Sequence, residues 1–175
     1  AEDHKVLLPV MVHLDGFHLT HVIEPIYIPE QNEVVKFLPP YQHPMALDPG
    51  KPSTMGAFGP PYIYTEMKKA QEANLTASKE VILQCWKEFA GVFGRHYSPV
   101  ESYHSEKAKV LLLTMGSFSE TAMEAVDKMR GEGKEVGLIR LRLWRPFPFE
   151  EIRQAVKDAG VLIVLDRAVS FGGPG

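Results

Sequence analysis

The most regular hydrophobic patterning lies in the last 68 residues, where apolar runs alternate with amphipathic ones. Three apolar runs predict buried strands, and the segments between the runs predict helices. The expected strands are KVLLLTMG (109–116), EVGLIRLRLW (135–144) and VLIVLD (161–166), and the second helix is EEIRQAVKDAG (150–160). Nearly continuous apolar strands that alternate with helices are typical of a parallel sheet covered on both faces. We therefore predict an α/β fold with a parallel sheet over residues 108–175.

The first of these helices is expected to begin at Ser117. Glu120 stands three residues later, which is the spacing of a capping box, where each side chain accepts a hydrogen bond from a free backbone amide of the other residue. Small and apolar residues at helical spacing predict its inner face, namely Ala122, Ala125, Val126 and Met129.

The N-terminal part of the chain has a different pattern. The run KVLLPVMVHLDGF (5–17) predicts a buried strand that the Asp15-Gly16 turn closes. Nine of the 14 prolines then fall between residues 22 and 61. Because proline fixes φ, removes an amide donor and favours an extended residue before it, we expect an extended, irregular arm in this stretch.

A long helix is predicted over residues 62–93, with Gly94 at its end. Residues at spacings of three and four place one apolar, buried stripe on it: Ile82, Cys85, Trp86, Phe89 and Phe93. Residues 95–107 are expected to form a polar connection. The predicted organisation is therefore an arm (1–61), a connecting helix and linker (62–107) and the α/β domain (108–175).

Composition narrows the classes of function. A net charge of −3 and a pI near 6.2 give no basic surface for nucleic acid, and the apolar runs are too short to cross a membrane. Cys85 is the only cysteine, so this chain has neither an internal disulfide nor the four thiolates that an iron–sulfur cluster normally uses. The expected location is the cytoplasm.

One candidate interface follows from the corner Arg145-Pro146-Phe147-Pro148. It joins the second predicted strand to the second helix, at the carboxyl edge where ligands and partners of such sheets gather. Two prolines would hold Arg145 and Phe147 in fixed directions. The end of the third strand adds Asp166, Arg167 and Phe171 to the same edge. The simpler alternative is a rigid turn in which Phe147 fills core space, with Asp166 and Arg167 paired to each other.

Other candidates for chemistry are weaker. Gly116-Ser117 could present backbone amides to an anion, but no P-loop or GxGxxG pattern surrounds them, and a structural cap is the preferred interpretation. The cluster His13, Asp15, His18 and His21 matches no closed metal site. The possible nucleophiles Ser117, Ser119, Ser170 and Cys85 lack a nucleophile elbow, so a hydrolase is not expected.

Several segments in order resemble the alpha subunit, or equivalent region, of pyruvate:ferredoxin oxidoreductases and related 2-oxoacid:ferredoxin oxidoreductases. They are LDGF followed by TH, then FGRHY, MGSFSETAMEAVDKMR, VGLIRLRLWRPFPFEEI and LDRAVSFG. The resemblance covers nearly the whole chain, and its most specific part is the RPFP stretch combined with LDRAVSFG.

The resemblance implies part of an enzyme that uses thiamine diphosphate and Mg²⁺ to decarboxylate pyruvate, passes electrons through [4Fe-4S] clusters to ferredoxin and forms acetyl-coenzyme A. It implies that residues 1–61 end the pyrimidine-side domain and that residues 108–175 resemble an incomplete C-terminal domain of transketolase. No catalytic, cofactor-binding or metal-binding residue carries over to this segment, whose expected role is assembly with other subunits or domains. The alternatives are a free-standing flavodoxin-like module that binds an anion or nucleotide, and a family member that acts on another 2-oxoacid or on oxalate.

Overall fold

The computed structural model describes residues 1–17, 19–38, 40–56 and 58–166. These residues form two compact units: the first comprises residues 1–11 and 25–97, and the second comprises residues 12–24 and the chain from residue 98 onward. No helix of the described residues is long and apolar enough to cross a membrane.

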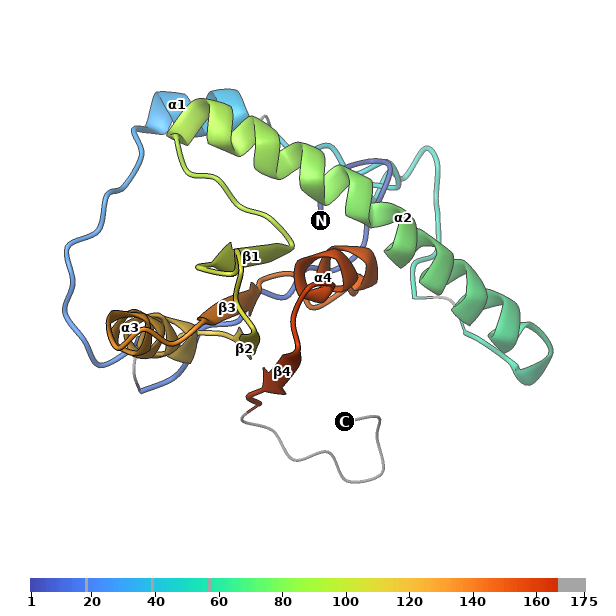
Figure 1. Cartoon of the computed structure of the whole chain (residues 1–175). Helices are drawn as coiled ribbons and strands as arrows, with labels where there is room; N and C mark the ends of the chain where they lie inside the picture. The colour runs from blue at the N-terminus through green and yellow to red at the C-terminus, as the bar shows by residue number, and fades with distance from the viewer. Residues whose placement is uncertain (18, 39, 57, 167–175) are drawn as a thin grey trace. The chain divides into compact units, whose positions relative to one another are not determined.

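The first unit contains a short and a long helix, α1 (Gln31–Phe37) and α2 (Pro61–Phe93) (Figure 1). Pro61 occupies the first helical position of α2, where its missing amide costs nothing. Gly94 ends the helix with φ 69°, and its amide donates to the carbonyl of Ala90 at 2.9 Å. The predicted long helix and its glycine end are confirmed.

The predicted buried stripe of α2 is only partly correct. Phe89 and Phe93 are partly buried and pack on Phe37 of α1, with ring centroids 5.8 and 5.7 Å from its ring. Cys85, by contrast, is exposed, so its assignment to the buried stripe was wrong. A shared helix face does not ensure burial, because α1 is short and covers only the last turns of α2.

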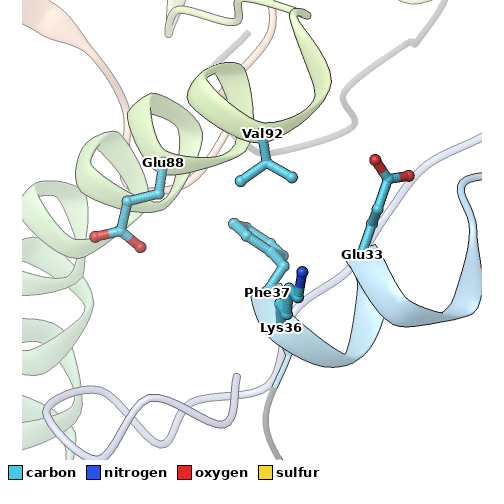
Figure 2. Close-up of a pocket in the computed structure, with 5 residues that line it drawn as sticks. All are labelled: Glu33, Lys36, Phe37, Glu88 and Val92. Atoms are coloured by element: carbon cyan, nitrogen blue, oxygen red, sulfur yellow. The ribbon is translucent and has the colours of Figure 1, made fainter.

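The helix α1 itself lies in the stretch predicted to be irregular, and that prediction was wrong at this point. Gln31–Phe37 falls between Pro29 and Pro39, in an interval without proline. The Glu33 side chain accepts a hydrogen bond from the Glu30 amide at 3.3 Å, which satisfies one free donor at the helix start. An open hollow of about 420 Å³ lies between the two helices. Its lining side chains, drawn in Figure 2, are Glu33, Lys36, Phe37, Glu88 and Val92.

The predicted strand over residues 5–17 was also wrong. These residues form no helix or strand, although the turn at Gly16 is present. Most of the apolar side chains are exposed, with Val12 at 83% and Leu14 at 74%, and none is fully buried. A strand exists only when a neighbouring strand pairs with its amides and carbonyls, and among the described residues no strand pairs with this segment.

The second unit is built on a four-stranded sheet with the order β1-β3-β2-β4. The strands are β1 (Val100–Tyr103), β2 (Val110–Met115), β3 (Val136–Leu141) and β4 (Val161–Val164), and the helices are α3 (Phe118–Gly131) and α4 (Phe149–Val156). The parallel arrangement of β3, β2 and β4 confirms the predicted α/β fold. The second strand and second helix are shorter than predicted.

The strand β1 pairs antiparallel with β3 and lies inside the segment predicted to be a polar connection. The prediction of a polar connection was wrong here, because the polar residues of β1 leave it without a clear hydrophobic pattern. Val100 packs on the core with Ile139, while Glu101 pairs with Arg140 of β3 and with Arg142 just after it. An edge strand needs only one buried face, so a four-residue strand such as VESY gives little hydrophobic signal.

Two clusters form the core, one on each face of the sheet. On one face α3 supplies Ala122 and Val126, which pack with Val136 and Leu138 of β3. The other face contains Ala108, Leu111 and Ile139, covered by Val156 of α4 and Ala159. Ala125, predicted on the inner face of α3, is exposed, and Ser119 is buried instead. Figure 1 shows the two helices on either side of the strands.

Candidate interface at the carboxyl edge of the sheet

Three loops gather at one edge of the second unit because β2, β3 and β4 run in the same direction. The strands end at Met115, Leu141 and Val164. Gly116 leads from β2 into α3, the RPFP corner leads from β3 into α4, and Leu165-Asp166 follows β4. The carboxyl edge of a parallel sheet is where sites of α/β proteins usually form.

The RPFP corner presents aromatic rings on a rigid support. Pro146 and Pro148 are buried, whereas Trp144 is 46% exposed and Phe149 is 65% exposed. Phe147 lies between them, with ring centroids 5.5 Å from Trp144 and 4.7 Å from Phe149. We refer to Trp144, Arg145, Phe147 and Phe149 as the aromatic corner.

Arg145 completes the aromatic corner by lying over an indole ring. Its guanidinium carbon is 4.9 Å from the centroid of Trp144, within the range of a cation–π contact, and Nη1 donates to the Trp144 carbonyl at 3.4 Å. Phe147 is partly buried and packs with Trp144 and Phe149, outside the two core clusters. Asp166 is exposed, whereas Arg167 and Phe171 lie outside the described residues.

A network of charges that the sequence did not reveal supports this edge. Arg142 makes a bidentate pair with Glu101, with Nε–Oε1 and Nη2–Oε2 distances of 2.6 and 2.9 Å. Arg140 lies two residues earlier and pairs with Glu120 of α3 at 2.8 Å. The alternation RLR predicts that both arginines lie on one side of the strand. It does not predict their partners, because Glu101 and Glu120 are distant in sequence.

The start of α3 differs from the predicted capping box. Ser117 adopts helical backbone angles and makes no side-chain cap, because its hydroxyl donates to the carboxylate of Asp15. Glu120 is engaged by Arg140. The capping-box prediction was therefore wrong, since both side chains have partners distant in sequence.

Several other residues that the sequence suggested as nucleophiles or metal ligands have separate partners. Ser119 is buried and accepts a hydrogen bond from Thr114 at 2.8 Å. His21 stacks on Phe17, with centroids 4.6 Å apart, and its Nδ1 lies 2.9 Å from the Thr20 hydroxyl. Asp15 binds Ser117, while His18 and Ser170 are outside the described residues. In the described part of the chain, no three His, Cys, Asp or Glu side chains gather as metal ligands.

Two family models match successive parts of the chain. The model described as "Pyruvate flavodoxin/ferredoxin oxidoreductase, thiamine diP-bdg" matches residues 1–87. The model described as "Pyruvate:ferredoxin oxidoreductase core domain II" matches residues 108–175. The two matches follow each other along the chain and concern the same class of enzyme.

Similar curated proteins agree with the family models. "Pyruvate synthase subunit PorA" of Methanothermobacter thermautotrophicus is 44% identical over 171 residues, which cover 98% of this chain and 45% of that protein. The protein of the same name from Pyrococcus furiosus is 42% identical over 173 residues, covering 98% and 44%. "NADH-dependent phenylglyoxylate dehydrogenase subunit alpha" of Aromatoleum evansii is 34% identical over 183 residues, covering 98% and 43%.

The chain spans less than half the length of these curated relatives. The resemblance that the sequence motifs indicated is confirmed along both matched parts. This chain belongs to the family of pyruvate:ferredoxin oxidoreductase alpha subunits.

Proposed function

We propose that this chain is part of a pyruvate:ferredoxin oxidoreductase, which oxidatively decarboxylates pyruvate to acetyl-coenzyme A and CO₂ and transfers electrons to ferredoxin. The observation that carries the proposal is the 44% identity to a pyruvate synthase subunit over 98% of the chain. The similarity to a phenylglyoxylate dehydrogenase subunit supports a second candidate, a family member that acts on another 2-oxoacid.

Within such an enzyme, the proposed role of this segment is structural. Large apolar side chains are exposed on the aromatic corner and along β4, where Val161 is 51% and Val164 is 60% exposed. Exposed apolar side chains that gather on an element are typical of sites where proteins interact. We propose that other subunits or domains of the oxidoreductase cover these surfaces, with Arg145, Phe147, Asp166, Arg167 and Phe171 at the contact.

The family model that matches residues 1–87 is described as thiamine diphosphate-binding, which supports this cofactor in the complete enzyme. In the part of the chain that the structure describes, no buried side-chain nitrogen or oxygen lacks a partner, and no cluster of acidic or histidine ligands is present. A pyrophosphate–metal site needs several oxygen ligands around the cation. We propose that thiamine diphosphate, Mg²⁺ and the [4Fe-4S] clusters belong to the complete complex and that this segment alone holds none of them.

The free-standing anion-binding module is not supported by the start of α3. That alternative needs free amides at the helix terminus, but the Ser117 amide donates to Asp15 at 2.8 Å. The division into an arm (1–61), a connection (62–107) and an α/β domain (108–175) remains our proposal for the domain organisation, with the difference that β1 at the end of the connection pairs into the sheet of the α/β domain. A cytoplasmic location is also proposed, and the single cysteine supports it.

Replacing Arg145 by alanine should weaken assembly with the partner subunits by about tenfold or more, since an aromatic and arginine cluster is the usual centre of binding energy. The variant removes the cation over Trp144. Native mass spectrometry of the complex at decreasing concentration would measure the assembled fraction.

Arg153→Ala is the matched control for this test. Arg153 is an exposed arginine on α4 that pairs locally with Glu150 at 2.6 Å. Equal assembly of the Arg145 and Arg153 variants would contradict the role of the aromatic corner, while leaving family membership untouched.

A further inference from the structure

The carboxylate of Asp15 lies at the start of α3, a helix more than 100 residues later in the chain. Its Oδ2 accepts a hydrogen bond from the Ser117 amide at 2.8 Å and a second one from the Ser117 hydroxyl. The amides at a helix start carry partial positive charge, so a carboxylate there is stabilised by the helix dipole as well as by hydrogen bonds.

Gly116 makes room for this carboxylate. Its φ is 81°, in the left-handed region, and a Cβ built on it would lie 3.2 Å from Oδ2 of Asp15. Both the backbone angle and the close approach favour glycine. We call Asp15, Gly116 and Ser117 the carboxylate latch.

The two sides of the carboxylate latch come from different parts of the family architecture. Asp15 lies in the region matched by the thiamine diphosphate-binding model, and Gly116 and Ser117 lie in the region matched by core domain II. Nevertheless, residues 12–24 belong to the same compact unit as the sheet. A contact between these two regions is therefore present inside one unit.

Hydrophobic burial contributes little to the position of segment 12–24. Its described residues form no helix or strand, and its apolar side chains are exposed, including Phe17 at 77% and Ile23 at 101%. Its local structure is one turn, in which the Phe17 amide donates to the Thr20 hydroxyl and the His21 amide donates to the Phe17 carbonyl, at 3.0 and 3.2 Å.

We propose that the carboxylate latch docks segment 12–24 onto the α/β module. The interaction surface is the start of α3, and its partner is the chain's own carboxylate at position 15. The latch thereby holds residues 12–24, a part of the region matched by the cofactor-binding model, against core domain II within one unit. This inference does not depend on which 2-oxoacid the complete enzyme uses.

Hydrogen–deuterium exchange of the full chain tests the proposal. In Asp15→Ala, we expect the amides of Phe17 and His21 to exchange about 5–30 times faster, which is the effect of losing one or two kcal/mol of local stability. The amides of β2 and β3 should keep their protection. Asp15→Asn retains an acceptor oxygen but loses the charge, so its increase should be smaller.

Asp48→Ala is the matched control, because the Asp48 carboxylate accepts a local amide hydrogen bond from Gly50 at 2.8 Å in the other unit. It should leave exchange at Phe17 and His21 unchanged. The proposal is overturned if Asp15→Ala also leaves these two amides unchanged.

If Asp15→Ala also loses protection in β2 and β3, the test of the carboxylate latch is Asp15→Asn. A localised increase at Phe17 and His21 in Asp15→Asn supports the carboxylate latch, and unchanged exchange at both amides overturns it. The readout is independent of assembly and activity, so its failure is distinct from failure of the proposed enzyme function.

Discussion

Replacing Leu138 by alanine should lower the free energy of unfolding of the α/β module by about 2–5 kcal/mol. Leu138 is 0% exposed, at the centre of the cluster formed by Ala122, Val126 and Val136. It pairs with Leu112 on β2 and with Tyr103 on β1, so the cavity would lie between three strands and α3. Urea unfolding followed by far-ultraviolet circular dichroism would measure the change in midpoint.

Leu47→Ala makes the same chemical change at a side chain that is 94% exposed. Its effect should stay within about 0.5 kcal/mol because no packing is lost. If the two variants unfolded at the same urea concentration, the assignment of Leu138 to the structural core would be wrong.

Replacing Gly137 by alanine should destabilise the same module by about 1–3 kcal/mol, because the added methyl group has no room. A Cβ at this position would lie 2.6 Å from the carbonyl oxygen and 2.9 Å from the carbonyl carbon of His104. Arg130 donates to this His104 oxygen and to the Val136 carbonyl, at 3.3 and 2.8 Å. Arg130 therefore binds the backbone of both His104 and Val136, the two residues that flank Gly137 in space and in sequence.

Gly131→Ala serves as the control for the glycine substitution. A Cβ there meets no atom within 4 Å, and alanine is the better helix former, so stability should be unchanged or slightly higher. Thermal unfolding of the two variants would compare them directly. A Gly137→Ala midpoint equal to that of the unsubstituted chain would show that β1 can move away from β3.

The parts of the fold that were predictable are those whose pattern is local. The apolar run of β2, the continuous apolar strand β3 and the long helix α2 each carry their signal within one element. The strand β1 was missed because its stability comes from pairing with β3 and from the Glu101–Arg142 ion pair. Residues 5–17 show the converse, since an apolar run forms a strand only where a neighbour pairs with it.

The candidate site was predictable to a similar extent. The order of the elements placed Arg145 and Phe147 at the carboxyl edge of the sheet, as the structure shows. Trp144 and Phe149 were missed as members of the aromatic corner, although they flank the two prolines. The partnership of Asp15 with Ser117 could not be read from the sequence, because 102 positions separate the two residues and no local rule joins them.

The most direct test of the proposed function is native mass spectrometry of the complex that contains this chain, isolated from its source organism. A place in a pyruvate:ferredoxin oxidoreductase predicts an assembly with further subunits or domains that carries thiamine diphosphate and iron–sulfur mass. A species that contains this chain without thiamine diphosphate, iron–sulfur clusters or any other polypeptide would contradict the proposed function.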